Sequence, residues 1–391
     1  MTRLGKFSIA LACVLAALAG GMWLGGHPEE LPEALRDAFV DDERALRAEV
    51  MKTIEDNYYK KVDEQKLEDA SIAGVVRSLR DRFSHYFPPR EARLFAESVS
   101  GSFEGIGMTV QENRRGLRVV SVFDDSPAAK AGLHVSDLIT RVNGESLAGK
   151  STDIATAKIK GRAGTSVTIT VLNPETKRSR DLKVKRARIE VPIVEARLRE
   201  QDGVKLGVVK LATFSSGAHG KLRQDVDRLL DRGADGIVLD LRGNGGGLLQ
   251  EAVLVSSIFI EDGLVVSTRG RRKPERKFTA QGDAIADQVP VVVMVDRGSA
   301  SASEIVAGAL KDRRRATIVG ARTFGKGVFQ EVEPLSNGGA LNLTVGSYYL
   351  PNGENISNRG VTPTVRARDL PRTRRDEALP VALETLREKL R

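Results

Sequence analysis

Three serines precede a helix-like segment in the stretch 295–310, which reads VDRGSASASEIVAGAL. A turn of small residues before a helix can hold a serine hydroxyl at the helix N-terminus. Lys326 follows the middle serine, Ser301, by 25 residues and lies between two glycines in TFGKGVFQ. A serine needs a base to attack a carbonyl carbon, and a neutral lysine is one of the few side chains that can serve. The pair predicts nucleophilic catalysis by a serine.

The residues alone leave three candidates for the nucleophile, Ser299, Ser301 and Ser303, with Ser301 preferred. Ser303 is followed by Glu304 and is typical of a helix N-cap, whereas Ser299 lies further back in the turn. A nucleophile just upstream of the cap would lie near unpaired helix amides, which also favour an oxyanion.

A glycine loop, GNGGG at 243–247, follows the apolar run GIVLDLR. Glycine allows a substrate carbonyl to approach the backbone closely, as an oxyanion site requires. A flexible turn or a phosphate-binding loop are the alternatives. No Lys-Ser or Lys-Thr pair follows the loop, so a Walker-type nucleotide site is poorly supported.

The composition is that of a soluble protein with a large core: 391 residues, 41% hydrophobic and 29% charged. The net charge of +9 comes from scattered basic runs without interleaved aromatic residues, which argues against a nucleic-acid platform. The four histidines, His27, His85, His134 and His219, show no metal-ligand spacing, so we expect no metal.

The N-terminus directs the chain across a membrane. Arg3 and Lys6 precede an apolar run over residues 7–24, in the order of a secretory signal or a membrane anchor. Cleavage and retention both stay open for this segment, residues 1–26. The positive end should stay inside, so we expect the remainder to be extracytoplasmic. Cys13 lies within the apolar run, so the exported part has neither a disulfide nor a thiol nucleophile.

The pattern beyond residue 26 predicts a multidomain α/β protein. Residues 27–100 form a helical region, and residues 101–188 form a β-rich module with two short helices. Residues 189–366 alternate apolar strands with amphipathic helices, which favours an α/β core with a mixed or parallel sheet. A last helix is expected within residues 367–391.

The β-rich module resembles a bacterial PDZ domain through its glycine loop at 105–107, SPAAKAGL and DLITRVNG. PDZ domains bind an extended peptide as an added strand, and loop amides take its terminal carboxylate. The resemblance implies six peptide-binding residues: Gly105, Ile106, Gly107 and Met108 at the carboxylate site, with Ala155 and Ile159 on the second helix as walls of the groove.

The third region resembles the carboxy-terminal processing proteases, which are tail-specific serine peptidases. Three motifs in this order carry the resemblance: DLRGNGGG at 240–247, GSASASEIVAGALKD at 298–312 and GARTFGKGVFQ at 320–330. With the PDZ module, the helical region and NISNRGVTPTV near 355–365, it covers most of residues 50–366. It implies an extracytoplasmic endopeptidase with a serine–lysine pair and no cofactor.

The resemblance implies that Ser301 is the nucleophile and Lys326 the base. To act, the lysine must be neutral, and an apolar pocket that includes Phe324 and Val328 would remove it from water. Gln330 matches the residue that orients the lysine. The four-residue spacing brings the two side chains together only in a helical turn, because on an extended strand they would lie ~13 Å apart.

The resemblance also places the oxyanion site at the amide of Gly246 or Gly247, with Gly246 preferred, together with the amide of Ala302. Asp312 follows the nucleophile helix, and we expect it to be structural, in a pair with Arg313 or Arg322. A Ser-His-Asp triad would need His219 beside Ser301, which we do not expect.

These expectations combine into an exported serine endopeptidase that cleaves proteins near their C-terminus. The PDZ domain would capture apolar C-terminal tails and could gate the protease, and the resemblance favours a homodimer. One alternative is a non-catalytic, membrane-associated PDZ adaptor that binds peptides. A basic membrane-surface or nucleic-acid binder ranks last.

Overall fold

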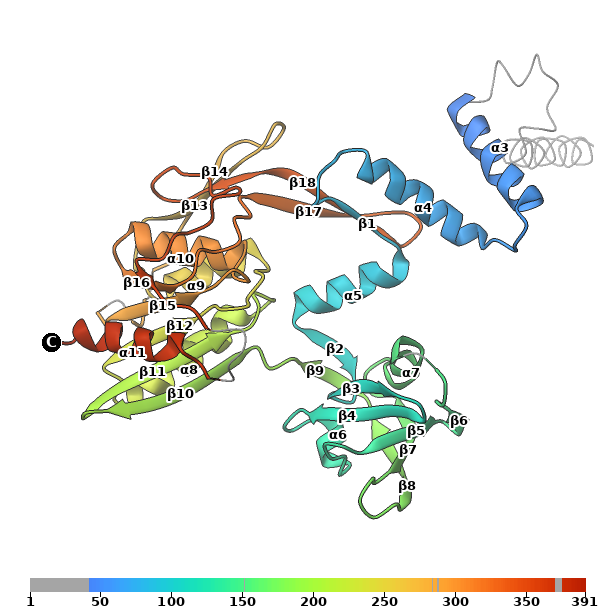
Figure 1. Cartoon of the computed structure of the whole chain (residues 1–391), viewed down its shortest axis with the longest axis horizontal. Helices are drawn as coiled ribbons and strands as arrows, with labels where there is room; N and C mark the ends of the chain where they lie inside the picture. Colours follow the sequence, from blue (N-terminus) through green and yellow to red (C-terminus); the bar gives the residue numbers. More distant parts are fainter. Residues whose placement is uncertain (1–41, 151, 283, 287, 370–374) are drawn as a thin grey trace, which may run out of the picture. The chain divides into compact units, whose positions relative to one another are not determined.

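The computed structural model describes residues 42–150, 152–282, 284–286, 288–369 and 375–391. The predicted signal or anchor over residues 1–26, with Cys13, lies outside these ranges. The chain divides into two units between Tyr86 and Phe87, of which the first is described from residue 42 onward; Figure 1 labels the elements of both. In the part of the chain that is described, no helix is both long and apolar enough to cross a bilayer.

The first unit contains two helices, α3 (Asp42–Asn57) and α4 (Glu64–Arg77). Asp63 caps α4 by accepting a hydrogen bond from the Lys66 amide, which leaves one fewer unpaired N–H at the helix start. The second unit opens with α5 (Pro89–Ser100), whose first residue is a proline and which ends at Gly101. The helices agree with the helical region predicted for this stretch.

The β-rich module is built as the sequence predicts. Its main sheet runs in the order β3-β4-β5-β7-β8, with β6 beside β5 and a separate pair β2–β9. Ser126 caps the short α6 with Pro127 in first position, as expected. The elements are β2 (Ser102–Gly105), β3 (Met108–Asn113), β4 (Gly116–Val122), α6 (Pro127–Lys130), β5 (Leu138–Val142), β6 (Glu145–Ser146), α7 (Thr152–Ile159), β7 (Ser166–Leu172), β8 (Ser179–Lys185) and β9 (Ala187–Glu190).

The core domain has a mixed six-stranded sheet in the order β10-β11-β12-β15-β16-β19. β10 and β11 pair antiparallel, and each of the other neighbours is parallel. This is the predicted mixed or parallel sheet. The strands are β10 (Val194–Gln201), β11 (Val204–Leu211), β12 (Gly236–Asp240), β15 (Val291–Val295), β16 (Ala316–Gly320) and β19 (Val365–Arg366).

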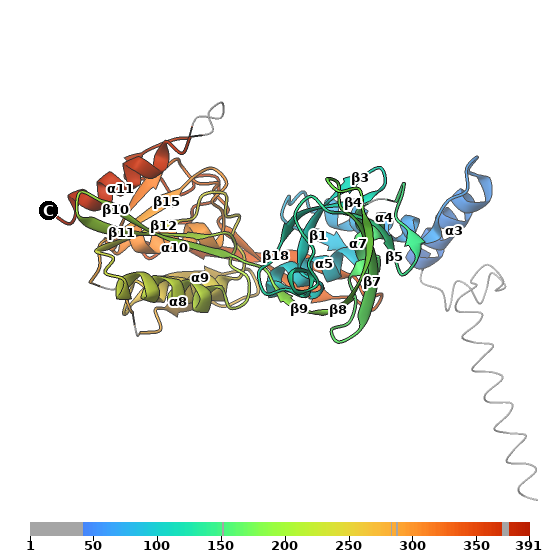
Figure 2. The ribbon, with the colours of Figure 1, turned by 90° about the horizontal axis from the view of Figure 1, so that it is seen from below.

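Helices cover both faces of this sheet, with α8 and α9 on one side and α11 on the other (Figure 2). Side chains alternate along each strand, so Ile237 and Leu239 join the core under α8–α10 while Val238 packs toward α11. Burial on both faces explains why β15 is apolar throughout and why β12 is apolar up to Asp240, its last residue. The helices are α8 (Ala218–Asp231), α9 (Leu249–Ser257), α10 (Ala302–Asp312) and α11 (Ala378–Glu388).

A second, antiparallel sheet completes the core domain. It contains β13 (Leu264–Arg269), β14 (Arg276–Thr279), β17 (Val328–Pro334) and β18 (Ala340–Tyr349). Tyr348 of β18 is almost fully buried in the same apolar core as α9 and α10. The lysine-containing segment 321–327 connects β16 of the first sheet to β17 of the second.

Arg242 joins the end of β12 to the chain before α11. Its guanidinium is largely buried and forms ion pairs with Asp240 at 2.7 Å, Asp369 at 2.7 Å and Asp376 at 2.8 Å. Asp376 also accepts a hydrogen bond from the Leu379 amide in the first turn of α11. The predicted C-terminal helix is therefore anchored immediately before the glycine loop.

Candidate active site

Ser301 is the N-cap of α10, at the end of the loop that leaves β15. Its backbone angles are φ 55° and ψ −115°, in a region that L-residues rarely occupy. Such strain is maintained only where the surroundings impose it, and it clusters at functional sites. The sequence prediction that Ser303 is the cap is wrong, because the helix begins two residues earlier.

The other two serines are tied to the structure by their hydroxyls. Ser299 donates to the Leu241 carbonyl at 2.8 Å, and Ser303 donates to the Asn244 carbonyl at 2.8 Å. Both are fully buried, whereas Ser301 is partly accessible. The geometry therefore favours Ser301 as the serine that can meet a substrate.

Glu304, one turn into α10, holds the serine turn and the lysine loop together. Its carboxylate is fully buried and accepts from the amides of Ser301 at 2.9 Å and Lys326 at 2.9 Å. Its other oxygen accepts from the Gly325 amide at 2.7 Å and from the Thr323 hydroxyl. Buried carboxylates need such partners, and here the partners are the two loops that carry the candidate nucleophile and base.

The sequence prediction overlooked this role of Glu304. The signal was present, because Ser301 and Glu304 have the spacing of a capping box, S/T-x-x-E. Assigning the cap to Ser303 concealed it.

The two glycines around Lys326 are required by the close approach of another segment. A Cβ on Gly325 would lie 3.1 Å from the backbone of Asn358 and Arg359, and Gly325 has φ +88°. A Cβ on Gly327 would lie 2.5 Å from the Ser357 amide. The NISNRG segment therefore packs directly against the lysine loop, which keeps Lys326 in one place with its side chain partly buried.

Tyr348 fixes the backbone of Lys326 from the second sheet. Its hydroxyl donates to the Lys326 carbonyl and lies 3.5 Å from the Ser301 carbonyl. Burial, with Glu304 nearby, raises the pKa of the Tyr348 hydroxyl well above its usual value. The hydroxyl therefore stays a proton donor across the pH range in which peptidases work.

Gln330 lies on β17, so the helical turn that would bring it beside Lys326 is absent. Its amide donates to the Thr344 hydroxyl of β18 at 3.0 Å. The register of β17 with β18 shifts between Phe329 and Gln330. Phe324, expected to help cover Lys326, is 46% exposed.

The glycine loop packs against the serine turn through Asn244. The buried Asn244 side chain donates to the Leu211 carbonyl at 2.8 Å and accepts from the Gly246 amide at 2.9 Å. Its own carbonyl accepts from the Ala300 amide at 3.0 Å. This asparagine locks the loop conformation and the nucleophile turn to each other.

Gly246 stands directly against the nucleophile. A Cβ at this position would lie 2.8 Å from the Ser301 Cβ and 3.0 Å from the Ala302 amide. The amide of Gly246 is already donated to Asn244, which disfavours it as an oxyanion donor. Among the described residues, no acceptor is recorded for the amides of Gly247 and Ala302.

Two further predictions concern residues around α8 and α10. Asp312 accepts from the amide of Asn352 and from its side chain, so the predicted pairing with Arg313 or Arg322 is wrong. The His219 ring nitrogen Nδ1 lies 2.8 Å from the carboxylate of Glu251, which also caps the start of α8.

Within the described ranges, no cluster of three or more His, Cys, Asp or Glu side chains could hold a metal ion.

The PDZ module leaves β3 at the edge of its sheet, with α7 packed on β3 and β4. Ile106 and Gly107 link β2 to β3 and, among the described residues, their amides have no recorded acceptor. The preceding Gly105 ends β2 and Met108 begins β3. The module's own described atoms therefore do not use these two amides, which the prediction assigns to a peptide carboxylate.

The predicted groove walls, Ala155 and Ile159, lie on α7. Both are buried in the core of the PDZ module, as is Ile106. Ile154, on the same helix, is 49% exposed.

Comparison with known proteins matches two parts of the chain to known families. Residues 105–191 match the PDZ domain, and residues 205–367 match peptidase family S41. A "Probable CtpA-like serine protease" of Staphylococcus epidermidis is 38% identical over 318 residues, which cover 81% of this chain and 64% of that protein. The chain therefore spans just under two thirds of that relative.

A "Carboxy-terminal-processing protease" of Bartonella bacilliformis is 37% identical over 322 residues, which cover 81% of this chain and 73% of that protein. The solved structure of a photosystem II D1 C-terminal processing protease is 30% identical and covers 84% of this chain and 94% of its own, with a TM-score of 0.49. On the extent of the Bartonella match, the chain belongs to the carboxy-terminal-processing proteases of peptidase family S41.

Proposed function

We propose that this chain is an exported serine endopeptidase that cleaves proteins at or near their C-terminus, with Ser301 as nucleophile and Lys326 as base. The observation that carries the proposal is the bridge made by Glu304, whose carboxylate binds the backbone amides of both residues. A buried anion with four donors fixes the two loops in one arrangement, which is what a two-residue catalytic centre requires.

The reaction follows from this arrangement. The uncharged Lys326 amine removes the proton from the Ser301 hydroxyl as its oxygen attacks the peptide carbonyl carbon. The tetrahedral intermediate collapses when the protonated lysine gives its proton to the leaving amine. A water molecule, deprotonated by the same lysine, then hydrolyses the acyl-enzyme and releases Ser301.

The oxyanion is held by the amides of Gly247 and Ala302 in this proposal. Gly246 allows the approach, because any side chain there would collide with the nucleophile turn. Ala302 begins α10, so its amide also carries the positive end of the helix dipole. Gln330 matches the residue that orients the lysine, and its amide is itself held by the hydroxyl of Thr344 on β18.

The PDZ module would capture the substrate tail. The Ile106–Gly107 turn takes the terminal carboxylate, and an apolar tail adds as a strand beside β3, with Ala155 and Ile159 of α7 as the walls of its groove. The same binding gates the protease. Turnover of a short peptide, measured with and without a separate apolar tail peptide, tests the gating, and equal rates would contradict it.

The proposal places the enzyme outside the cytoplasm. It rests on the basic start and the apolar run at residues 7–24. Fractionation of cells that express the full chain tests this placement, together with the mass of the mature protein, which separates cleavage from anchoring. Recovery in the cytoplasm at full mass would contradict it.

A homodimer is part of the proposal. The first unit exposes several large apolar side chains, on its two helices and just after each of them, namely Leu46, Val50, Tyr58, Tyr59, Val75 and Leu79. Exposed apolar surface supports an association surface in this proposal. Light scattering should give twice the chain mass, with monomers for a Val75→Asp variant. A monomer for the unaltered protein would rule the dimer out.

The catalytic assignment is tested with an unfolded protein substrate that bears an apolar tail. Ser301→Ala should abolish cleavage, and Lys326→Arg, which keeps the charge but cannot act as the base, should lower kcat at least about 10³-fold. Lys277→Arg, on an exposed lysine of β14, is the matched control. Retained cleavage by Lys326→Arg would refute the mechanism. Binding without cleavage by the unaltered protein would favour the adaptor.

A further inference from the structure

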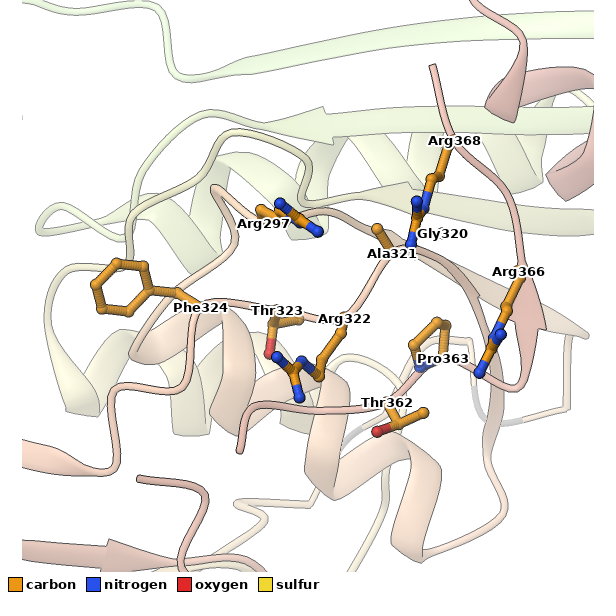
Figure 3. A pocket seen from close by; sticks show the side chains of 10 residues that line it. All are labelled: Arg297, Gly320, Ala321, Arg322, Thr323, Phe324, Thr362, Pro363, Arg366 and Arg368. Carbon is orange, nitrogen blue, oxygen red and sulfur yellow. The ribbon is translucent and has the colours of Figure 1, made fainter. Parts of the chain in front are cut away.

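A pocket of about 630 Å³ opens beside the candidate active site at the carboxyl ends of the parallel strands. Four arginines line it, Arg297, Arg322, Arg366 and Arg368, together with Thr323 and Phe324 (Figure 3). They come from three segments: the loop after β15, the loop after β16, and the stretch at β19. Ligands of α/β proteins bind at this end of the sheet.

The four guanidinium groups are not neutralised by the described protein. No acidic residue lines the pocket, and within the described ranges no carboxylate lies at ion-pair distance from any of them. Arg242 shows the contrast, since it contacts three carboxylates in the same domain. Four unpaired like charges repel one another, so a concave site of this kind attracts an anion strongly.

The pocket shares its walls with the catalytic loops. Arg297 lies four residues before Ser301 on the same loop, and Arg322 lies four residues before Lys326. Thr323, also in the wall, donates its hydroxyl to Glu304, which holds the two catalytic residues together. An anionic group in the pocket would therefore be part of whatever polypeptide occupies the active site.

We infer that this pocket is a substrate subsite for acidic side chains, one that binds Asp or Glu residues near the scissile bond. The inference rests on the proposed peptidase function and adds a specificity to it. Guanidinium groups bind carboxylates in pairs of parallel hydrogen bonds, so several arginines around one space fit two adjacent acidic residues. The exposed ring of Phe324 offers an apolar contact to the uncharged side chains of the same substrate peptide.

The subsite is distinct from the carboxylate site of the PDZ module. That loop offers backbone amides to one terminal carboxylate, whereas the pocket offers four full charges to internal side chains. A substrate would then be selected twice, by its tail and by acidic residues at a fixed distance from the cleavage point.

The first experiment measures binding without cleavage. Fluorescence anisotropy is recorded on the Ser301→Ala protein with two amidated peptides, one containing a Glu-Glu pair and one a Gln-Gln pair. Amidation removes the carboxylate that the PDZ loop would take. We expect the acidic peptide to bind about 10-fold more tightly, with the difference shrinking in high salt.

Arg322→Ala combined with Arg366→Ala should abolish that preference. Arg271→Ala combined with Arg272→Ala removes the same charge from the exposed turn after β13 and should leave the preference intact. An equal loss in both double variants would overturn the subsite, because net charge alone would then explain the binding. Tripolyphosphate is tested alongside, and tight binding of it without any preference for the acidic peptide would also overturn it.

The second experiment uses the active protein. The Glu-Glu pair is moved residue by residue along a peptide with one cleavage point, and kcat/KM is compared with the Gln-Gln series. A subsite predicts a higher kcat/KM for Glu-Glu than for Gln-Gln at one or two positions only. In the Arg322→Ala, Arg366→Ala variant the ratio of the two kcat/KM values should fall to about 1. An advantage independent of position would overturn it. Since binding is read on Ser301→Ala, a failed peptidase assignment shows as absent cleavage and leaves the binding result interpretable.

Discussion

Replacing Glu304 with Gln turns one oxygen of a buried carboxylate into an NH₂ group and hardly changes the side-chain volume. The carboxylate accepts four hydrogen bonds, two on each oxygen. Whichever way the new amide turns, two former donors face its NH₂ group. If the new NH₂ group faces Gly325 and Thr323, the threonine hydroxyl can rotate and accept from it, but the buried Gly325 amide is left without an acceptor.

The cost can be worked from those contacts. One unpaired buried donor costs about 1–3 kcal/mol, and the bonds that remain lose the strength that the charge gave them, so we expect a total loss of about 2–4 kcal/mol. The neutral glutamine does not carry the desolvation cost of a buried charge, and this gain offsets part of the loss. Because the freed amides belong to the lysine and serine loops, kcat should fall as well, with a smaller change in KM.

Urea unfolding gives the free energy of unfolding, and steady-state cleavage of a short peptide gives kcat and KM. Glu333→Gln makes the same chemical change at an exposed position of β17 and serves as the control. If the two variants unfold within about 0.5 kcal/mol of each other and cleave at the same rate, the carboxylate does not hold the two loops, and the argument fails.

Gly246→Ala puts a methyl group 2.8 Å from the Ser301 Cβ and should lower kcat at least about 10²-fold. Gly245→Ala, where a Cβ meets nothing within 4 Å, should keep kcat, and equal rates would contradict the close approach. Tyr348→Phe removes a group whose folded pKa lies above its unfolded value, so its stabilisation is complete below about pH 10 and is lost as pH rises further. The variant should therefore lose less stability above pH ~10, and parallel urea titrations would contradict this.

The architecture could be predicted from the sequence because short local patterns are enough to identify its strands and helices. The five residues of β12 and of β15 are all buried, and such apolar runs between amphipathic helices indicate a parallel sheet. Likewise, Ser126 with Pro127 marks the start of α6 whatever surrounds it. The serine turn, the glycine loop and the lysine loop were found for the same reason, since each is a short motif with its own chemistry.

The sequence did not predict the residues that hold the serine and lysine loops together, because these residues contact partners that are distant in sequence. Tyr348 reaches the backbone of Lys326 across 22 residues, and Glu304 reaches it across the same number. No spacing rule applies at that separation. Gln330 shows the converse, because its four-residue spacing from Lys326 brings the two side chains together only in a helical turn, and Gln330 lies on a strand.

The ion pairs of Arg242 connect the last helix to the residues just before the glycine loop. This side chain stands between Asp240, where β12 ends, and the glycine loop, and its other partners begin the final helix. Removal of the last helix would therefore uncover an apolar sheet face and also release Arg242, which immediately precedes the glycine loop. Tags for purification or immobilisation therefore do not belong at the C-terminus.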